Sequence, residues 1–169
     1  MTDADHTPRT DDLVERNRGA VQHFAHRELA APPALRIAVV ACMDARMDIH
    51  EILGIDNGDA HIIRNAGGVI TDDVIRSLCL SQIALGTREI VLVHHTRCGV
   101  AGLDEDAWRA DLAAEVNATP EWSFSGFADP YDDVRTSIAA LRASPFVPHT
   151  DHVRGFVYDV DTGLLDEVD

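Results

Sequence analysis

The sequence predicts an α/β fold in which helices flank a central, mostly parallel β-sheet. Residues 36–42 (RIAVVAC) and 89–94 (EIVLVH) are continuous runs of aliphatic residues, the pattern typical of strands buried on both faces of a parallel sheet. Segments with apolar residues at helical spacing alternate with such runs along the chain. Strands that alternate with helices favour parallel pairing, because each crossover returns the chain to the same end of the sheet.

The N-terminal half supplies the first strand–helix units. Apolar residues at helical spacing predict a helix over 11–29. A strand over 36–42 follows it, and a short helix over 48–53 comes next. After a second strand over 60–64, Thr71 is placed to cap a helix that runs to about residue 85.

The C-terminal half continues the alternation and ends at a sheet edge. After the third strand, residues 104–116 are predicted to form a helix with an acidic first turn. Proline, glycine and serine interrupt 117–131, which indicates a loop, and a further helix is expected over 132–143. Residues 153–160 alternate in hydrophobicity as a strand does. A turn then leads to 164–168, which we expect to pair at the edge, in antiparallel direction.

The length of 169 residues suits one domain that folds without disulfide bonds. We expect a single α/β metal-binding domain over 11–169, preceded by a mobile, acidic tail over 1–10. The three cysteines are an odd number, which argues against a disulfide framework. Because no apolar run is long enough to span a bilayer and no signal segment opens the sequence, we expect a cytoplasmic location.

Net charge excludes two classes of partner. Asp and Glu total 29 against 14 basic residues, all of them Arg, for a net charge of −15. Such a surface repels phosphate backbones and anionic lipids, so neither nucleic acid nor a membrane is expected as a partner. The lysine-free, acidic composition fits either a salt-adapted host or a GC-rich codon bias, and the sequence does not distinguish the two.

Metal-ligand side chains follow two of the predicted strands. Cys42 ends the first strand, and His95 and Cys98 follow the third. Neighbouring strand ends lie about 5 Å apart, so the three side chains could converge on one ion. Two thiolates and one imidazole suit zinc, and three protein ligands leave a fourth position open, as in catalytic sites. Taken alone, a single cysteine after a strand is usually a small core residue.

A carboxylate and a guanidinium come directly after the first candidate ligand. Asp44 could accept a hydrogen bond from hydroxide at the open metal position, or it could occupy that position as a fourth ligand. A bidentate pair with Arg46 would hold the carboxylate off the metal. The alternative is a surface ion pair of little energetic consequence.

Three motifs occur in the order and at the spacing of one enzyme family: Cys42-x-Asp44-x-Arg46, Arg64-Asn65-Ala66-Gly67 and His95-x-x-Cys98-Gly99. From residue 37 to the C-terminus the chain resembles the short microbial branch of the β-class carbonic anhydrases. The resemblance implies one zinc ion per chain held by Cys42, His95 and Cys98, with Asp44 and Arg46 as the catalytic dyad. It also implies homodimers, or higher homo-oligomers, with the pocket at the subunit interface.

The expected activity is reversible hydration of carbon dioxide to bicarbonate and a proton, by zinc-activated hydroxide that Asp44 orients. The small residues Ala66, Gly67 and Gly68 are expected to line the substrate pocket, because they permit close approach. One alternative is a hydrolase of carbonyl sulfide or carbon disulfide on the same zinc site. A second alternative is a non-catalytic zinc-binding protein in which Asp44 stays on the metal.

Two positions depart from patterns common in the family. Arg97 precedes the second candidate cysteine ligand, where many members carry an acidic residue. Either Arg97 adds positive charge near the metal or it points to solvent. Val39 stands where the bicarbonate-regulated branch carries a tryptophan, so we expect no such allosteric site and favour the open form of the metal site.

Overall fold

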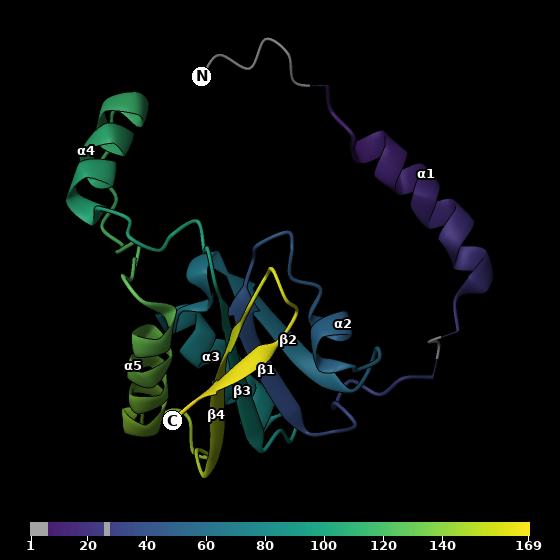
Figure 1. The fold of residues 1–169 in the computed structure, drawn as a ribbon. Helices are drawn as coiled ribbons and strands as arrows, with labels where there is room; N and C mark the ends of the chain where they lie inside the picture. Colours follow the sequence, from purple (N-terminus) through teal and green to yellow (C-terminus); the bar gives the residue numbers. More distant parts are fainter. Residues whose placement is uncertain (1–6, 26–27) are drawn as a thin grey trace.

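The computed structural model describes residues 7–25 and 28–169. Its centre is one five-stranded sheet with the strand order β2-β1-β3-β4-β5 (Figure 1). The strands are β1 (Ile37–Cys42), β2 (Ala60–Asn65), β3 (Glu89–His95), β4 (His152–Tyr158) and β5 (Leu165–Val168). Strands β1 to β4 pair in parallel, and β5 pairs antiparallel with β4 at the edge. The predicted fold class, including the antiparallel edge, is confirmed.

The helices lie close to their predicted positions. They are α1 (Thr10–Ala20), α2 (Ile49–Leu53), α3 (Asp72–Ile83), α4 (Glu105–Val116) and α5 (Pro130–Ala143), with a 3₁₀ turn at Ala66–Gly68. The Thr71 hydroxyl accepts a hydrogen bond from the backbone N–H of Val74 at 3.3 Å, as its predicted capping role requires. Helix α5 begins inside the predicted loop, because Asp129 caps it and Pro130 occupies its first turn.

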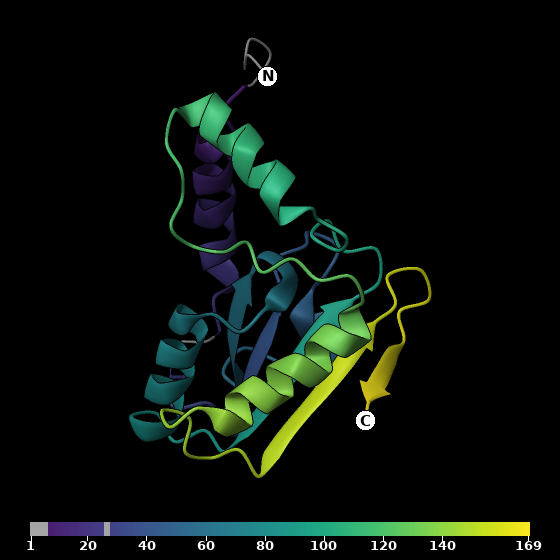
Figure 2. The ribbon, with the colours of Figure 1, turned by 90° about the vertical axis from the view of Figure 1, so that its left-hand side faces the viewer.

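The sheet is covered on both faces, which is why β1 and β3 are so apolar. Helix α3 packs on β1 and β2, and α5 packs on β3 and β4 (Figure 2). Alternate residues of β1 point to opposite cores: Val40 packs with Leu78 and Leu92 on the side of α3 and α5, and Val39 packs with Met47 on the other. Ala38 to Ala41 are completely buried, as expected for a central parallel strand.

Two helices project away from the sheet. Helix α1 and helix α4 have no buried residue, and the apolar residues Leu13 and Val14 of α1 are exposed (Figure 1). The predicted helix over 11–29 is therefore too long: α1 ends at Ala20 and a 3₁₀ turn follows. A short helix that buries no residue is marginal in water, which agrees with its early end.

The predicted tail over 1–10 is only partly described. Residues 1–6 lie outside the described residues, and α1 already begins at Thr10. Within the described part of the chain, no helix combines the length and the hydropathy that a membrane crossing demands.

Gly155 tests how tightly α5 packs on the sheet. A Cβ atom at this position of β4 would lie 2.1 Å from Val134 Cγ1 of α5, far inside van der Waals contact. We expect Gly155→Ala to lower the free energy of unfolding by about 3 kcal/mol, because α5 must move outward. Urea unfolding measures this change. The control is Gly19→Ala in α1, where a Cβ meets nothing within 4 Å. Equal stability of the two variants would contradict this packing.

Candidate metal centre

Three metal-binding atoms meet at the carboxyl ends of β1 and β3. Cys42 ends β1, His95 ends β3, and Cys98 lies in the turn that follows β3. The two strands are parallel neighbours, so their ends meet at one sheet edge. The Cys42 and Cys98 sulfurs and a ring nitrogen of His95 all lie within 4.8 Å of one another, and all three residues are buried. The convergence that the strand order required is present in the structure.

The geometry of these donors fits zinc. The two sulfurs are 3.9 Å apart, whereas a disulfide requires about 2.05 Å. Two thiolates placed about 2.3 Å from a tetrahedral zinc would lie about 3.8 Å from each other. The ion would therefore fit between the sulfurs with little movement of the chain.

The imidazole of His95 is oriented for a metal. Its Nδ1 lies 2.9 Å from the carbonyl oxygen of Thr96, which can only accept, so Nδ1 carries the hydrogen. The lone pair is then on Nε2, which is buried and has no hydrogen-bond partner among the described residues. Metal-bound histidines characteristically donate their other N–H to such a carbonyl.

The two cysteine thiols are joined by a hydrogen bond in which either sulfur can be the donor. This hydrogen bond and the nearby imidazole of His95 lower the pKa of Cys42. The same hydrogen bond and burial raise the pKa of Cys98. A divalent cation displaces thiol protons, because its cysteine ligands bind as thiolates.

Asp44 lies beside the donors and is held by Arg46. The guanidinium donates from Nε to Asp44 Oδ1 at 2.8 Å and from Nη2 to Asp44 Oδ2 at 2.6 Å. The backbone N–H of Arg46 donates to Oδ1 as well, at 2.9 Å. These bonds hold the pKa of Asp44 well below its usual range. Asp44 Oδ2 is 3.7 Å from Nε2 of His95, so an ionised carboxylate faces the metal position.

Two further residues fix the loop that carries Cys42 and Asp44. Arg64 of β2 donates to the carbonyl oxygens of Cys42 and Asp44, at 3.0 and 2.8 Å. Gly68 lies against the same loop: its φ is +74°, and a Cβ there would be 2.8 Å from the backbone nitrogen of Cys42. Sequence reasoning gave Arg64 no role, although it opens the second motif. Its contacts span 22 and 20 residues of chain, which spacing alone does not reveal.

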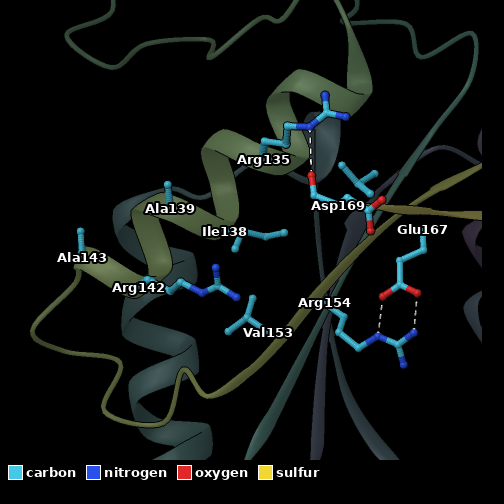
Figure 3. Close-up of a pocket in the computed structure, with 10 residues that line it drawn as sticks. Arg135, Ile138, Ala139, Arg142, Ala143, Val153, Arg154, Glu167 and Asp169 are labelled. Carbon is cyan, nitrogen blue, oxygen red and sulfur yellow. Dashed lines mark hydrogen bonds and ion pairs between the residues drawn. The ribbon is translucent and has the colours of Figure 1, made fainter.

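A small cavity adjoins the donors. It measures about 120 Å³, and its lining includes Asp44, Ala66, Gly67 and Val100 as well as both cysteines. Of the three predicted pocket residues, Ala66 and Gly67 line this cavity, and Gly68 lies behind it against the Cys42 backbone. A larger cavity of about 800 Å³ lies elsewhere, between α5 and the β4–β5 edge (Figure 3). The donor set, rather than cavity size, marks the metal centre.

His94 lies next to His95 but belongs to the other face of the sheet. It is completely buried, and its Nε2 is 2.7 Å from Asp133 Oδ2 of α5. Successive strand residues face opposite sides, so one histidine reaches the metal centre and the other anchors the helix.

Comparison with known proteins assigns the family. A family model described as carbonic anhydrase matches residues 37–122. "Beta-carbonic anhydrase 1" of Mycobacterium tuberculosis is 48% identical over 159 residues, which cover 94% of this chain and 97% of that protein. The chain belongs to the β-carbonic anhydrase family.

One solved structure and one further sequence relative are also similar to this chain. The crystal structure of carbonic anhydrase from Streptococcus mutans superposes with a TM-score of 0.91 at 39% identity, over 97% of this chain and 99% of that one. A protein named carbon disulfide hydrolase, from Acidithiobacillus thiooxidans, is 35% identical in an alignment that covers 82% of this chain and 80% of that protein. The relatives of this chain therefore bear names for two different activities.

Gly68 provides a test of how the backbone supports the metal centre. We expect Gly68→Ala to weaken zinc affinity by about tenfold or more, because the new Cβ displaces the backbone of Cys42. Chelator competition with zinc analysis measures the affinity. The control is Gly99→Ala at the cavity rim, where a Cβ meets nothing within 4 Å. Unchanged zinc affinity in Gly68→Ala would show that the close approach does not support the site.

Proposed function

We propose that this chain catalyses the reversible hydration of carbon dioxide to bicarbonate and a proton, with one zinc ion held by Cys42, His95 and Cys98. The observation that carries the proposal is the incomplete donor set. Three buried side chains converge, and the fourth candidate, Asp44, is held beside them by Arg46. Three protein ligands with an adjacent fixed carboxylate are typical of a catalytic site, not of a structural one.

Zinc bound at such a site supplies Lewis-acid chemistry that makes water nucleophilic near neutral pH. The protein supplies the orientation. Because Arg46 keeps Asp44 ionised, its carboxylate only accepts hydrogen bonds. It therefore accepts a hydrogen bond from the attacking oxygen and so turns a lone pair of that oxygen toward the carbon of the substrate. The bicarbonate product can stay against Asp44 only through its hydroxyl group, because two anionic oxygens repel each other.

The cavity beside the donors suits a small linear substrate. Apart from Asp44 and the two cysteines, its lining is uncharged and includes Ala66, Gly67 and Val100. Carbon dioxide would lie on this lining with its carbon toward the metal position. The proposal assigns Ala66 and Gly67 to substrate contact, and Gly68 to support of the ligand loop.

We propose further that the chain works as a homodimer whose interface covers the pocket. Helices α1 and α4 have no buried residue, and both carry apolar side chains that are exposed in the single chain, Val14 and Trp108 among them. Exposed apolar surface on projecting helices is typical of an interface that a second copy covers. Both helices project from the same end of the sheet (Figure 2).

A second candidate is hydrolysis of carbon disulfide. Relatives that bear this name align with 79–85% of the chain at 33–35% identity. Carbon disulfide is a linear analogue of carbon dioxide, so the same donors and cavity could bind it. Parallel assays of carbon dioxide hydration and of hydrogen sulfide release distinguish the two. We expect rapid hydration and at most trace sulfide release; the reverse result would assign the chain to the hydrolases.

A zinc-binding protein without activity is the remaining alternative. It requires Asp44 on the metal under all conditions. The three hydrogen bonds from Arg46 to Asp44 favour the opposite arrangement.

Asp44→Asn tests the role of the carboxylate. We expect the variant to keep its zinc and to lose hydration activity by about 100-fold or more, because the amide no longer provides an acceptor-only partner for the attacking oxygen. Stopped-flow hydration assays and zinc analysis of the same samples measure both quantities. Asp151→Asn, at an exposed position in the turn before β4, is the matched control. Near-full turnover in Asp44→Asn would contradict the assigned role.

A further inference from the structure

Arg97 connects the Asp44–Arg46 pair to the turn between β4 and β5. We propose that Arg97 and Asp161 are positioning residues, which keep Arg46 on Asp44 and thereby keep Asp44 off the metal. This inference rests on the proposed function, because it concerns the vacancy of the fourth metal position. Three links carry it: a carbonyl contact to Arg46, a left-handed backbone at Arg97 and an ion pair to Asp161.

The first link is the contact between Arg46 and the backbone of Arg97. Nη2 of Arg46 donates to the Arg97 carbonyl oxygen at 3.0 Å, in addition to its bonds to Asp44. The Arg46 side chain is 46% exposed, so water competes for its donors. Among the described residues, the Arg97 carbonyl is the only partner of this guanidinium other than Asp44. It therefore fixes the direction from which Arg46 approaches the carboxylate.

The second link is the backbone of Arg97, which turns this carbonyl toward Arg46. Arg97 has a φ of +53°, a left-handed conformation that non-glycine residues seldom adopt. Such a conformation persists only where the surroundings enforce it. The preceding residue is tied to β4 and the turn beyond it: the N–H of Thr96 donates to the Tyr158 carbonyl at 2.9 Å, and the Thr96 hydroxyl accepts from the N–H of Val160 at 3.2 Å.

The third link is the side chain of Arg97. It reaches across 64 residues of chain to pair with the carboxylate of Asp161. Asp161 is itself fixed in its turn, because its N–H donates to Asp159 Oδ1 at 2.8 Å. The Arg97 side chain is 60% exposed, but it is paired and does not simply extend into solvent. Arg97 thus makes two contacts: its carbonyl oxygen accepts a hydrogen bond from Arg46, and its guanidinium pairs with Asp161.

The contacts of Arg97 limit how far the Asp44 carboxylate can rotate. Its Oδ2 already lies 3.7 Å from Nε2 of His95, within the group of metal-binding atoms. If Arg46 loses its hydrogen bond to the Arg97 carbonyl, its hydrogen bonds to Asp44 weaken. A small rotation then brings the Asp44 carboxylate to the fourth metal position. The Arg97–Asp161 pair would therefore favour the form of the enzyme with a vacant position.

Activity of the zinc-loaded full chain gives the first test. We expect Asp161→Ala and Arg97→Gly each to lower kcat/KM for hydration about tenfold, with Arg97→Ala lower still, because alanine resists the left-handed backbone. The double variant Arg97→Gly/Asp161→Ala should be no worse than either of its single variants. The control is Glu167→Ala, which removes an exposed arginine–carboxylate pair with Arg154 between β4 and β5, the two strands that the Asp161 turn joins, and should stay within about twofold of the parent. Asp161→Ala indistinguishable from Glu167→Ala would overturn the proposal.

Anion binding to the cobalt-substituted protein gives the second test, and it is independent of turnover. Azide titration, followed by the visible spectrum of the cobalt, reports whether the fourth position is free. We expect Asp161→Ala to weaken azide binding about tenfold. Asp44→Asn/Asp161→Ala should bind azide as Asp44→Asn does, because the competing carboxylate is gone.

The activity assay and the azide titration distinguish failure of the positioning role from failure of the proposed function. Unchanged azide affinity in Asp161→Ala, or a loss that persists in the Asp44→Asn background, would overturn the positioning role. A parent protein that takes up cobalt but hydrates no carbon dioxide would overturn the proposed function, and the azide comparison would still decide the role of Arg97 and Asp161. Arg97→Gly and Asp161→Ala suffice should Arg97→Ala fail to fold.

Discussion

Parallel pairing between β1 and β3 is the constraint on which the metal centre depends. The register runs from Ile37 opposite Glu89 to Ala41 opposite Val93, so the strands end at the same edge with Cys42 and His95 close together. A one-residue shift of β3 would turn His95 to the opposite face of the sheet. The buried aliphatic residues of both strands fix this register, because each alternate set must meet its own core. The strand register that packs the sheet therefore also positions the metal-binding side chains.

Burial of the donors has a free-energy cost that a bound metal would reduce. The two thiols are buried beside a ring nitrogen of His95 that has no hydrogen-bond partner among the described residues, and buried polar atoms of this kind are disfavoured unless they are satisfied. Arg64 and Gly68 hold the ligand loop in place from its outer side, so the site is prepared before an ion arrives. Metal affinity and local stability should accordingly rise together.

Patterns of neighbouring residues predicted most of the fold and the metal donors. The aliphatic runs identified β1 and β3, and strand order then placed Cys42 beside His95. Residues whose roles depend on distant contacts were not predicted. The contact of Arg64 with Cys42 and the pairing of Arg97 with Asp161 join segments that only the folded chain brings together.

Helix α1 could be predicted from the sequence, but its packing partner could not. Its apolar spacing predicted a helix, and the structure leaves the apolar side chains Leu13 and Val14 of this helix exposed. Amphipathic spacing is the same whether the apolar side meets the chain's own core or another molecule. A single sequence therefore indicates that such a helix has a packing partner without indicating which one.

Zinc K-edge X-ray absorption on the purified chain shows whether three side chains hold an ion whose fourth position is free. We expect two sulfur donors, one imidazole and one light-atom donor that added azide replaces. A protein that purifies without metal, or a spectrum with a fourth side-chain donor that azide never displaces, would contradict this expectation.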